Sequence, residues 1–342
     1  MLIGIDPHKG SHTAVVVDRD EVEVARVKVR ADRHQLARLL AFAEPFTPRT
    51  WAIESAGGLG YLLAQQLVAA GEPVVDVPAT LASRVRLLGS GRGSKNDPND
   101  ALSTAIAALR HPDLRSVAPE DHTQVLALLA RRHKNLSSLR TQAICRLHAE
   151  LAALIPGGMS RSLTAPIAAT ALARVRPMSG VETARVQLAT DLLADVRRLD
   201  EAIIENKNRT KTAVLAAGTS ITDIHGVGPL VAALIIGQTA DVHRFRTADR
   251  FASYNGTAPI EASSGPWVRH RLNPRGNRQL NHALHRVAVS QMRNDTPGRV
   301  YYERKKAEGK SHKEALRALK RRVSDAVYRQ LLADANKNVA TE

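Results

Sequence analysis

The stretch LIGIDPHKGSHTAVVVDRDEVEVARVKVR, residues 2–30, carries the pattern of three consecutive β-strands. Residues 2–5 and 14–17 are short apolar runs, and residues 22–29 largely alternate apolar and polar side chains. Such alternation is typical of a strand with one buried face, and turn-forming residues separate the three segments. Three strands joined this closely predict an antiparallel meander.

Beyond this meander, helical and extended patterns alternate. The sequence predicts helices over residues 34–42 and 59–70 and strands over residues 51–53 and 73–77. Three antiparallel strands followed by two strands added through helical crossovers give the order βββαβαβ, which is that of the ribonuclease H-like fold. We therefore expect an α/β domain of this class at the N-terminus.

The middle of the chain predicts long helices. Residues 119–154 and 192–210 carry apolar stripes with steps of three and four, and Asn206 lies on the second stripe. Such helices could pair as a hairpin, dimerise as a coiled coil or pack in an ordinary bundle. We expect a connecting segment over residues 156–182. The expected organisation is a catalytic domain (1–115), a helical coiled-coil region (116–215) and a mainly helical, basic C-terminal domain (216–342).

The chain of 342 residues has a formal net charge of +16 and a pI of about 10.5. Residues 261–330 hold 17 Lys and Arg against 6 Asp and Glu, a net charge of +11. This concentration favours a polyanionic partner, which could be DNA, RNA or an anionic membrane. With 3% aromatic residues, base stacking is not the main means of binding.

Other features of composition narrow the setting. The single cysteine, Cys145, excludes an internal disulfide framework and fits a reducing compartment. No run of about 18 apolar residues predicts a membrane span, and the first residues do not resemble a signal peptide. We therefore expect a cytoplasmic protein that does not bind a membrane.

Four carboxylates stand where the predicted fold would gather them. Asp6 and Glu54 each follow an apolar strand, and Asp97 and Asp100 are three apart on a helix that Pro98 would start. Clustered carboxylates repel each other unless cations lie between them, and such oxygen ligands suit two-metal phosphoryl transfer. Each one alone also has a simpler explanation: a turn residue, a surface acid or a helix cap. His8, nearby, could approach such a metal ion, although we expect its side chain to face solvent.

The C-terminal third offers nucleic-acid contacts. Gly226 and Gly228 precede a helix started by Pro229, as in a helix-hairpin-helix clamp on a DNA backbone, although a simple glycine turn gives the same pattern. Ser263-Ser264-Gly265 by itself is an ordinary turn, with no His–Asp partner to activate a serine. A basic loop is predicted to contact phosphates; its arginines are Arg269, Arg271, Arg275 and Arg278.

These phrases resemble the insertion sequence 110 family of transposases. GIDPHK (4–9), AIES (52–55) and KNDPNDA (95–101) resemble its DEDD motif. FASYNGTAPIEASSG (251–265) and RLNPRGNRQLNHALH (271–285) resemble its second conserved domain. The resemblance spans nearly the whole chain, with the motifs in the family's order.

The resemblance implies a RuvC-like N-terminal domain, a coiled-coil middle and a C-terminal transposase domain. Its DEDD residues fall on Asp6, Glu54, Asp97 and Asp100, which would bind Mg²⁺, or Mn²⁺ in its place. Its catalytic serine falls on Ser264, with Ser263 as the alternative. The family's site assembles between protomers, which implies a homodimer or homotetramer, and a structured guide RNA pairs with donor and target DNA.

We therefore expect a DNA recombinase that cuts and rejoins strands at an insertion sequence. Two alternatives remain at this stage. One is a RuvC-like junction nuclease that uses metal-activated water, with Ser264 only structural. The other is a non-catalytic nucleic-acid scaffold, in which the carboxylates cap and solubilise.

Overall fold

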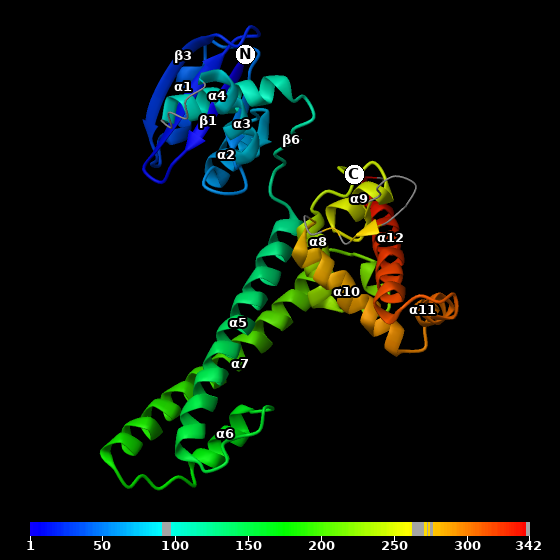
Figure 1. Ribbon diagram of the computed structural model, residues 1–342. Helices are drawn as coiled ribbons and strands as arrows, with labels where there is room; N and C mark the ends of the chain where they lie inside the picture. Colours follow the sequence, from blue (N-terminus) through cyan, green and yellow to red (C-terminus); the bar gives the residue numbers. More distant parts are fainter. Residues whose placement is uncertain (91–96, 262–269, 272, 274–275, 340–342) are drawn as a thin grey trace. The chain divides into compact units, whose positions relative to one another are not determined.

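The computed structural model describes residues 1–90, 97–261, 270–271, 273 and 276–339 (Figure 1). They form two compact units, Met1–Glu120 and Asp121–Glu342. Within these residues, no helix combines the length and the apolar character needed to span a membrane.

The first unit is built on one mixed sheet, and the predicted strand order is confirmed. Among the described residues the strands lie in the order β3-β2-β1-β4-β5-β6, with β1 antiparallel to β2 and parallel to β4. Strands β4 and β5 are also parallel, which gives the ribonuclease H-like arrangement. The strands are β1 (Leu2–Pro7), β2 (Ser11–Val17), β3 (Glu23–Arg30), β4 (Thr50–Glu54), β5 (Val74–Val77) and β6 (Arg115–Ser116).

Helices cover both faces of this sheet. Because side chains alternate along a strand, Ile3 and Ile5 of β1 point to one face, where they join a core with Leu39 and Leu63 from α1 and α2. The opposite face is covered by α3 and α4, and Gly4 of β1 lies on it. The helices are α1 (Gln35–Ala43), α2 (Tyr61–Ala69), α3 (Ala79–Ser90) and α4 (Asp97–Arg110).

The second unit begins with a helical hairpin. Helices α5 (His122–Leu154) and α7 (Gly180–Ala216) lie alongside each other (Figure 1) and share a buried apolar seam. Asn206 lies buried on the α7 side and donates from Nδ2 to the Leu129 carbonyl oxygen of α5, 3.1 Å away. Its predicted place on the seam is confirmed. The pairing within one chain is the hairpin alternative, and dimerisation as a coiled coil stays a prediction.

The remaining helices of the second unit pack around a separate core. Phe251, Leu280, Leu284 and Val323 are among its fully or almost fully buried residues. Strands β7 (Ile260–Glu261) and β8 (His270–Arg271) pair antiparallel, with Ile260 opposite Arg271 and Glu261 opposite His270. The helices are α8 (Pro229–Thr239), α9 (Ala248–Tyr254), α10 (Arg278–Arg293), α11 (Pro297–Ala307) and α12 (His312–Val339), and a short 3-10 turn, η1 (Ile221–Asp223), precedes α8.

The structure adds elements that the sequence patterns did not predict. Helix α6 (Ala165–Leu172) lies within the expected connecting segment and packs against α7. Along α5, Leu136, Ala143, Leu147 and Leu151 are buried in the seam with α7, and Leu126 and Ala130 are buried in the core formed with the later helices.

Candidate metal centre

Asp6 is placed by the alternation of strand β1. It lies two residues after Gly4, so its side chain shares the face covered by α4, and the residue is 7% exposed. The strand register puts Asp6 opposite Thr13 of β2, and Thr13 opposite Lys28 of β3. Residues directly opposite each other share a face, so Asp6, Thr13 and Lys28 form a row across three strands.

Helix α4 reaches Asp6 because the residues at its contact with β1 are small. Ala101 and Ala105 are fully buried against the sheet. A Cβ on Gly4 would lie 2.1 Å from the Ala101 carbonyl oxygen and 2.6 Å from the Ala105 nitrogen. This close approach of helix to strand brings the first turn of α4, with Asp97 and Asp100, to the end of β1.

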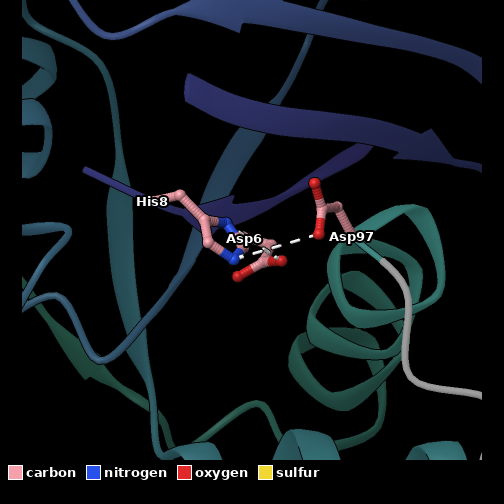
Figure 2. Close-up of side chains that lie close together, drawn as sticks. All are labelled: Asp6, His8 and Asp97. Carbon is pink, nitrogen blue, oxygen red and sulfur yellow. Dashed lines mark ion pairs between the residues drawn. The ribbon is translucent and has the colours of Figure 1, made fainter. Parts of the chain in front are cut away.

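Three side chains converge at this point (Figure 2). The ligand atoms of Asp6, His8 and Asp97 all lie within 4.8 Å of one another. His8 Nδ1 is 3.5 Å from Asp6 Oδ2, and His8 Nε2 is 3.9 Å from Asp97 Oδ1. Carboxylate oxygens and an imidazole nitrogen are ligands for divalent ions, and a largely buried carboxylate such as Asp6 is stabilised by a nearby cation. These residues therefore fit a divalent metal ion.

Basic side chains neutralise the two carboxylates of α4. Lys28 Nζ donates to Asp97 Oδ2 at 2.8 Å, and this hydrogen bond, with the charge of Lys28, lowers the pKa of the Asp97 carboxyl. Arg86 of α3 forms an ion pair with Asp100, which is 7% exposed. We call Asp6, His8, Asp97 and Asp100 the acidic edge, because they lie at the end of β1.

Glu54 ends β4 beside Asp6. The parallel register pairs Ile5 with Ile53, so Asp6 and Glu54 follow at corresponding positions of adjacent strands. Ala52 packs in the core beneath α3 and α4, and Glu54, two residues on, shares that face. Just after it, Ser55 adopts a left-handed φ of 52°, and the Ala56 nitrogen donates to Asp76 at 2.7 Å. The described group of three does not include Glu54 or Asp100.

The C-terminal candidates are placed in part. Gly226 has a φ of 91°, and a Cβ there would come within 3.0 Å of Ser290 on α10, so this glycine packs against a helix. Gly228 caps α8 and has open space around its Cα. Arg271 belongs to β8, and Arg278 starts α10 with an exposed side chain. Ser263, Ser264, Arg269 and Arg275 lie outside the described residues.

Sequence reasoning missed several partners of the acidic edge. For His8, sequence reasoning favoured solvent over an approach to the metal; its side chain is 48% exposed and lies between Asp6 and Asp97. Lys28 and Arg86 come from elements distant in sequence. The role of Lys28 could have been predicted only from the row of residues that joins Asp6 to Lys28 across the strands.

Comparisons with known families agree with this arrangement. A model of the DEDD domain of IS110 elements, described as a transposase, matches residues 3–156. A second model, described as the transposase IS116/IS110/IS902 family, matches residues 218–303. The two matched regions include both groups of candidate residues.

Individual relatives extend over nearly all of the chain. The 44.8 kDa protein of insertion element IS116 from Streptomyces clavuligerus is 28% identical, covering 96% of this chain and 94% of its own. The 42 kDa protein of IS900 from Mycobacterium paratuberculosis is 27% identical, covering 99% and 97%. A solved structure of T. thermophilus RuvC with a Holliday junction is 21% identical, with a TM-score of 0.28, over 34% of this chain and 98% of its own. The fold assignment rests on the strand order above.

Proposed function

Because the chain belongs to the IS110 family of transposases, we propose that it cuts and rejoins the DNA strands of an insertion sequence by phosphoryl transfer. The observation that carries this proposal is the convergence of Asp6, His8 and Asp97 at the end of the central strand. Carboxylates gathered at one sheet edge suit the binding of cations that contact a phosphodiester.

In this proposal, Asp6 and Asp97 hold Mg²⁺, and Glu54 and Asp100 complete the ligand set. The register that places Glu54 beside Asp6 supports this role for Glu54. The position of Asp100, one turn along α4, supports it for Asp100. Divalent ions bound there would neutralise charge on the reacting phosphate. Lys28 and Arg86 would have to release Asp97 and Asp100 at least in part, because each now occupies a carboxylate oxygen.

We assign the nucleophile to Ser264, on the resemblance of its Ser-Gly context to the family's catalytic serine. Its hydroxyl oxygen would form a bond to phosphorus, and one bond from phosphorus to a sugar oxygen would break. The serine proton would pass to solvent, and the departing sugar oxygen would take a proton from solvent to become a hydroxyl. The covalent link keeps the phosphodiester energy, so a hydroxyl of another strand can reverse the step and rejoin DNA.

Asp6 and Ser264 belong to different units of the chain. We propose that they meet across the subunits of a homodimer or homotetramer, as the family resemblance implies. The same resemblance implies a guide RNA, and the net charge of +11 over residues 261–330 supports polyanion binding.

One assay tests this function. The protein is incubated with Mg²⁺, RNA transcribed from the non-coding sequence beside the element, and end-labelled DNA that spans the element junction. Denaturing gels then detect protein–DNA adducts. We expect adducts with the wild type and with the matched control Ser263→Ala, and none with Ser264→Ala.

Other outcomes would contradict the proposal. Free nicked product from Ser264→Ala would identify water as the nucleophile. Equal behaviour of the wild type and Asp6→Asn, with binding intact and no cleavage by either, would identify a scaffold.

A further inference from the structure

A pocket of about 280 Å³ lies in the second unit, away from the acidic edge in the sequence. One wall is a face of α10, on which successive polar residues recur at helical spacing. The opposite wall comes from α12 and from the turns at residues 256 and 276. The lining residues are Gly256, Asn273, Gly276, Arg278, Asn281, His282, His285 and Lys320.

Two glycines shape the pocket wall. Gly256 has a φ of 71°, and a Cβ on Gly276 would lie 2.5 Å from the Gly256 nitrogen and Cα. No other residue could replace Gly276 without moving this backbone. The contact fixes the turn before α10 against the turn after α9.

A chain of hydrogen bonds fixes the polar wall. Buried Asn255 donates from Nδ2 to Ser324 Oγ at 2.8 Å, and its carbonyl accepts from Asn281 Nδ2 at 2.8 Å. Asn281 Oδ1 in turn accepts from Lys320 Nζ at 3.0 Å. The ammonium group is therefore held in one position instead of moving freely at the surface.

The pocket gathers positively charged side chains, and none of its described lining residues is acidic. Lys320 is 7% exposed, and burial lowers its pKa, with Arg317 adding to the effect. His285 beside it also has a pKa lowered by burial, by Lys320 and by His282. Within the part of the chain that the structure describes, no carboxylate forms an ion pair with these lining residues. A buried cation of this kind is costly unless an anion joins it.

The geometry selects a small anion with an attached chain. Drug-sized ligands occupy about 300 to 1,000 Å³, and this pocket is smaller. Its rim residues Arg278 and His282 are exposed, so the anion can belong to a larger molecule outside. The backbone N–H groups of Gln279 and Leu280 are already bound by the capping Asn277, so side chains provide the charge.

We propose that this pocket binds one backbone phosphate of the DNA strand on which the protein acts, with Lys320 and Arg278 contacting the same phosphate. The choice of DNA rests on the proposed function. In sequence, the lining residues Gly256 and Asn273 flank Ser264, so a phosphate held here would anchor the strand close along the chain to the assigned nucleophile.

The test measures DNA binding without cleavage. Fluorescence anisotropy with a labelled element-end duplex, in EDTA over a range of NaCl, gives the slope of log K against log salt. Neutralising one phosphate contributes about 0.9 to this slope. We expect Lys320→Met and Arg278→Gln each to weaken binding about tenfold and to lower the slope by about one. Because Lys320 and Arg278 contact the same phosphate, the slope of the double variant should also be lower by only about one.

A matched control and a second variant keep the result clear. Lys313→Gln removes an exposed lysine from the same helix, outside the pocket, and should leave the wild-type slope unchanged. Arg278→Gln changes an exposed residue, so it tests the pocket even if Lys320→Met does not fold; circular dichroism reports folding. Unchanged slopes in both folded pocket variants would overturn the proposal.

Two further outcomes would separate this proposal from two alternatives, which are binding of two phosphates and binding of RNA. A loss of about two in the double variant would mean two separate phosphates, which contradicts a single-phosphate pocket. A slope change with RNA of the same sequence but none with DNA would assign the pocket to RNA and overturn the DNA assignment. Because binding is measured without Mg²⁺, failure of the adduct assay leaves this result standing, and failure here leaves the adduct assay standing.

Discussion

The acidic edge and the cationic pocket carry opposite charges, and these charges are balanced in different ways. At the acidic edge, the protein itself supplies counter-charges: Lys28 binds Asp97, and Arg86 binds Asp100. In the cationic pocket, defined by the eight lining residues above, Lys320 has only the amide oxygen of Asn281 as a described hydrogen-bond partner. The acidic edge can keep its charges in the absence of a metal ion, whereas no described carboxylate pairs with Lys320 in the cationic pocket.

This contrast indicates which ligand each region takes. A carboxylate group with movable basic partners can exchange them for a divalent ion. A buried ammonium with no acid beside it is stabilised by a bound anion. DNA cleavage requires both, because the phosphate must be held and its charge neutralised during reaction.

The largest expected effect comes from Asp6→Asn. Loss of a carboxylate at the acidic edge should lower cleavage about a thousandfold, since metal stabilisation of the reacting charge is worth several kcal/mol. DNA affinity in EDTA should not fall.

Lys320→Met should show the reverse pattern, with weaker DNA binding and normal Mn²⁺ binding. Calorimetry measures Mn²⁺ affinity, and anisotropy measures DNA affinity. If either variant lost both affinities equally, the two regions would not have separate ligands.

Gly4→Ala tests the packing that builds the acidic edge. The added methyl group would meet the backbone of α4 at Ala101, so the helix must move or the strand must bend. Overpacking of this kind lowers the free energy of unfolding by roughly 1–3 kcal/mol. Urea unfolding measures the loss.

Gly10→Ala is the matched control, because a Cβ there meets nothing within 4 Å. We expect a change within about 0.5 kcal/mol for it. If Gly4→Ala were equally mild, close approach of α4 would not be what positions Asp97.

Much of the first unit was predictable because its signals are local. Alternation over residues 2–30 predicts the meander, and the apolar run that ends before Glu54 predicts the neighbouring strand. The confirmed strand order then places Asp6 and Glu54 at one sheet edge. Helix α6 was missed because half of its residues are alanine and it lacks a polar face with helical spacing.

The partners of the candidate residues were less predictable for a physical reason. Lys28 of β3 contacts Asp97 of α4, 69 residues later, and Lys320 of α12 contacts Asn281 of α10, 39 residues earlier. Such contacts depend on register and helix packing, which no short motif encodes. The assignments of Glu54, Asp100 and Ser264 stay predictions for the experiments above.

Lys28→Gln gives a smaller effect at the acidic edge. The ammonium of Lys28 occupies one oxygen of Asp97 and repels an incoming cation, so its removal should raise Mn²⁺ affinity. Exposed ion pairs are weak, so we expect a gain of at most about fivefold in affinity. The pKa of Asp97 should rise toward its ordinary value, because Lys28 is the main cause of its lowering.

Arg26→Gln is the control for this variant, because Arg26 lies on the same strand and pairs with Glu23 instead of Asp97. Calorimetry should give the wild-type Mn²⁺ affinity. A gain of the same size in both variants would mean that net charge, and not the contact with Asp97, controls the site.

The smallest effect concerns two histidines, buried His12 in the first unit and half-buried His285 in the second. Burial is the main cause that lowers the pKa of His12, which hydrogen-bonds Gln35 at 3.0 Å, and burial also lowers the pKa of His285. Between the ordinary value of about 6.5 and these lowered values, the unfolded chain binds more protons than the folded chain. The free energy of unfolding should therefore fall as the pH drops below about 6.5.

Phosphate should separate the two histidines. An anion in the cationic pocket offsets the charge of Lys320 and raises the pKa of His285 toward its ordinary value, whereas His12 has no such ligand. NMR titrations in phosphate and in a zwitterionic buffer of equal ionic strength measure both values. Equal shifts would show that phosphate acts through general screening. A shift confined to His285 would locate the anion at the pocket, because screening would act on both histidines.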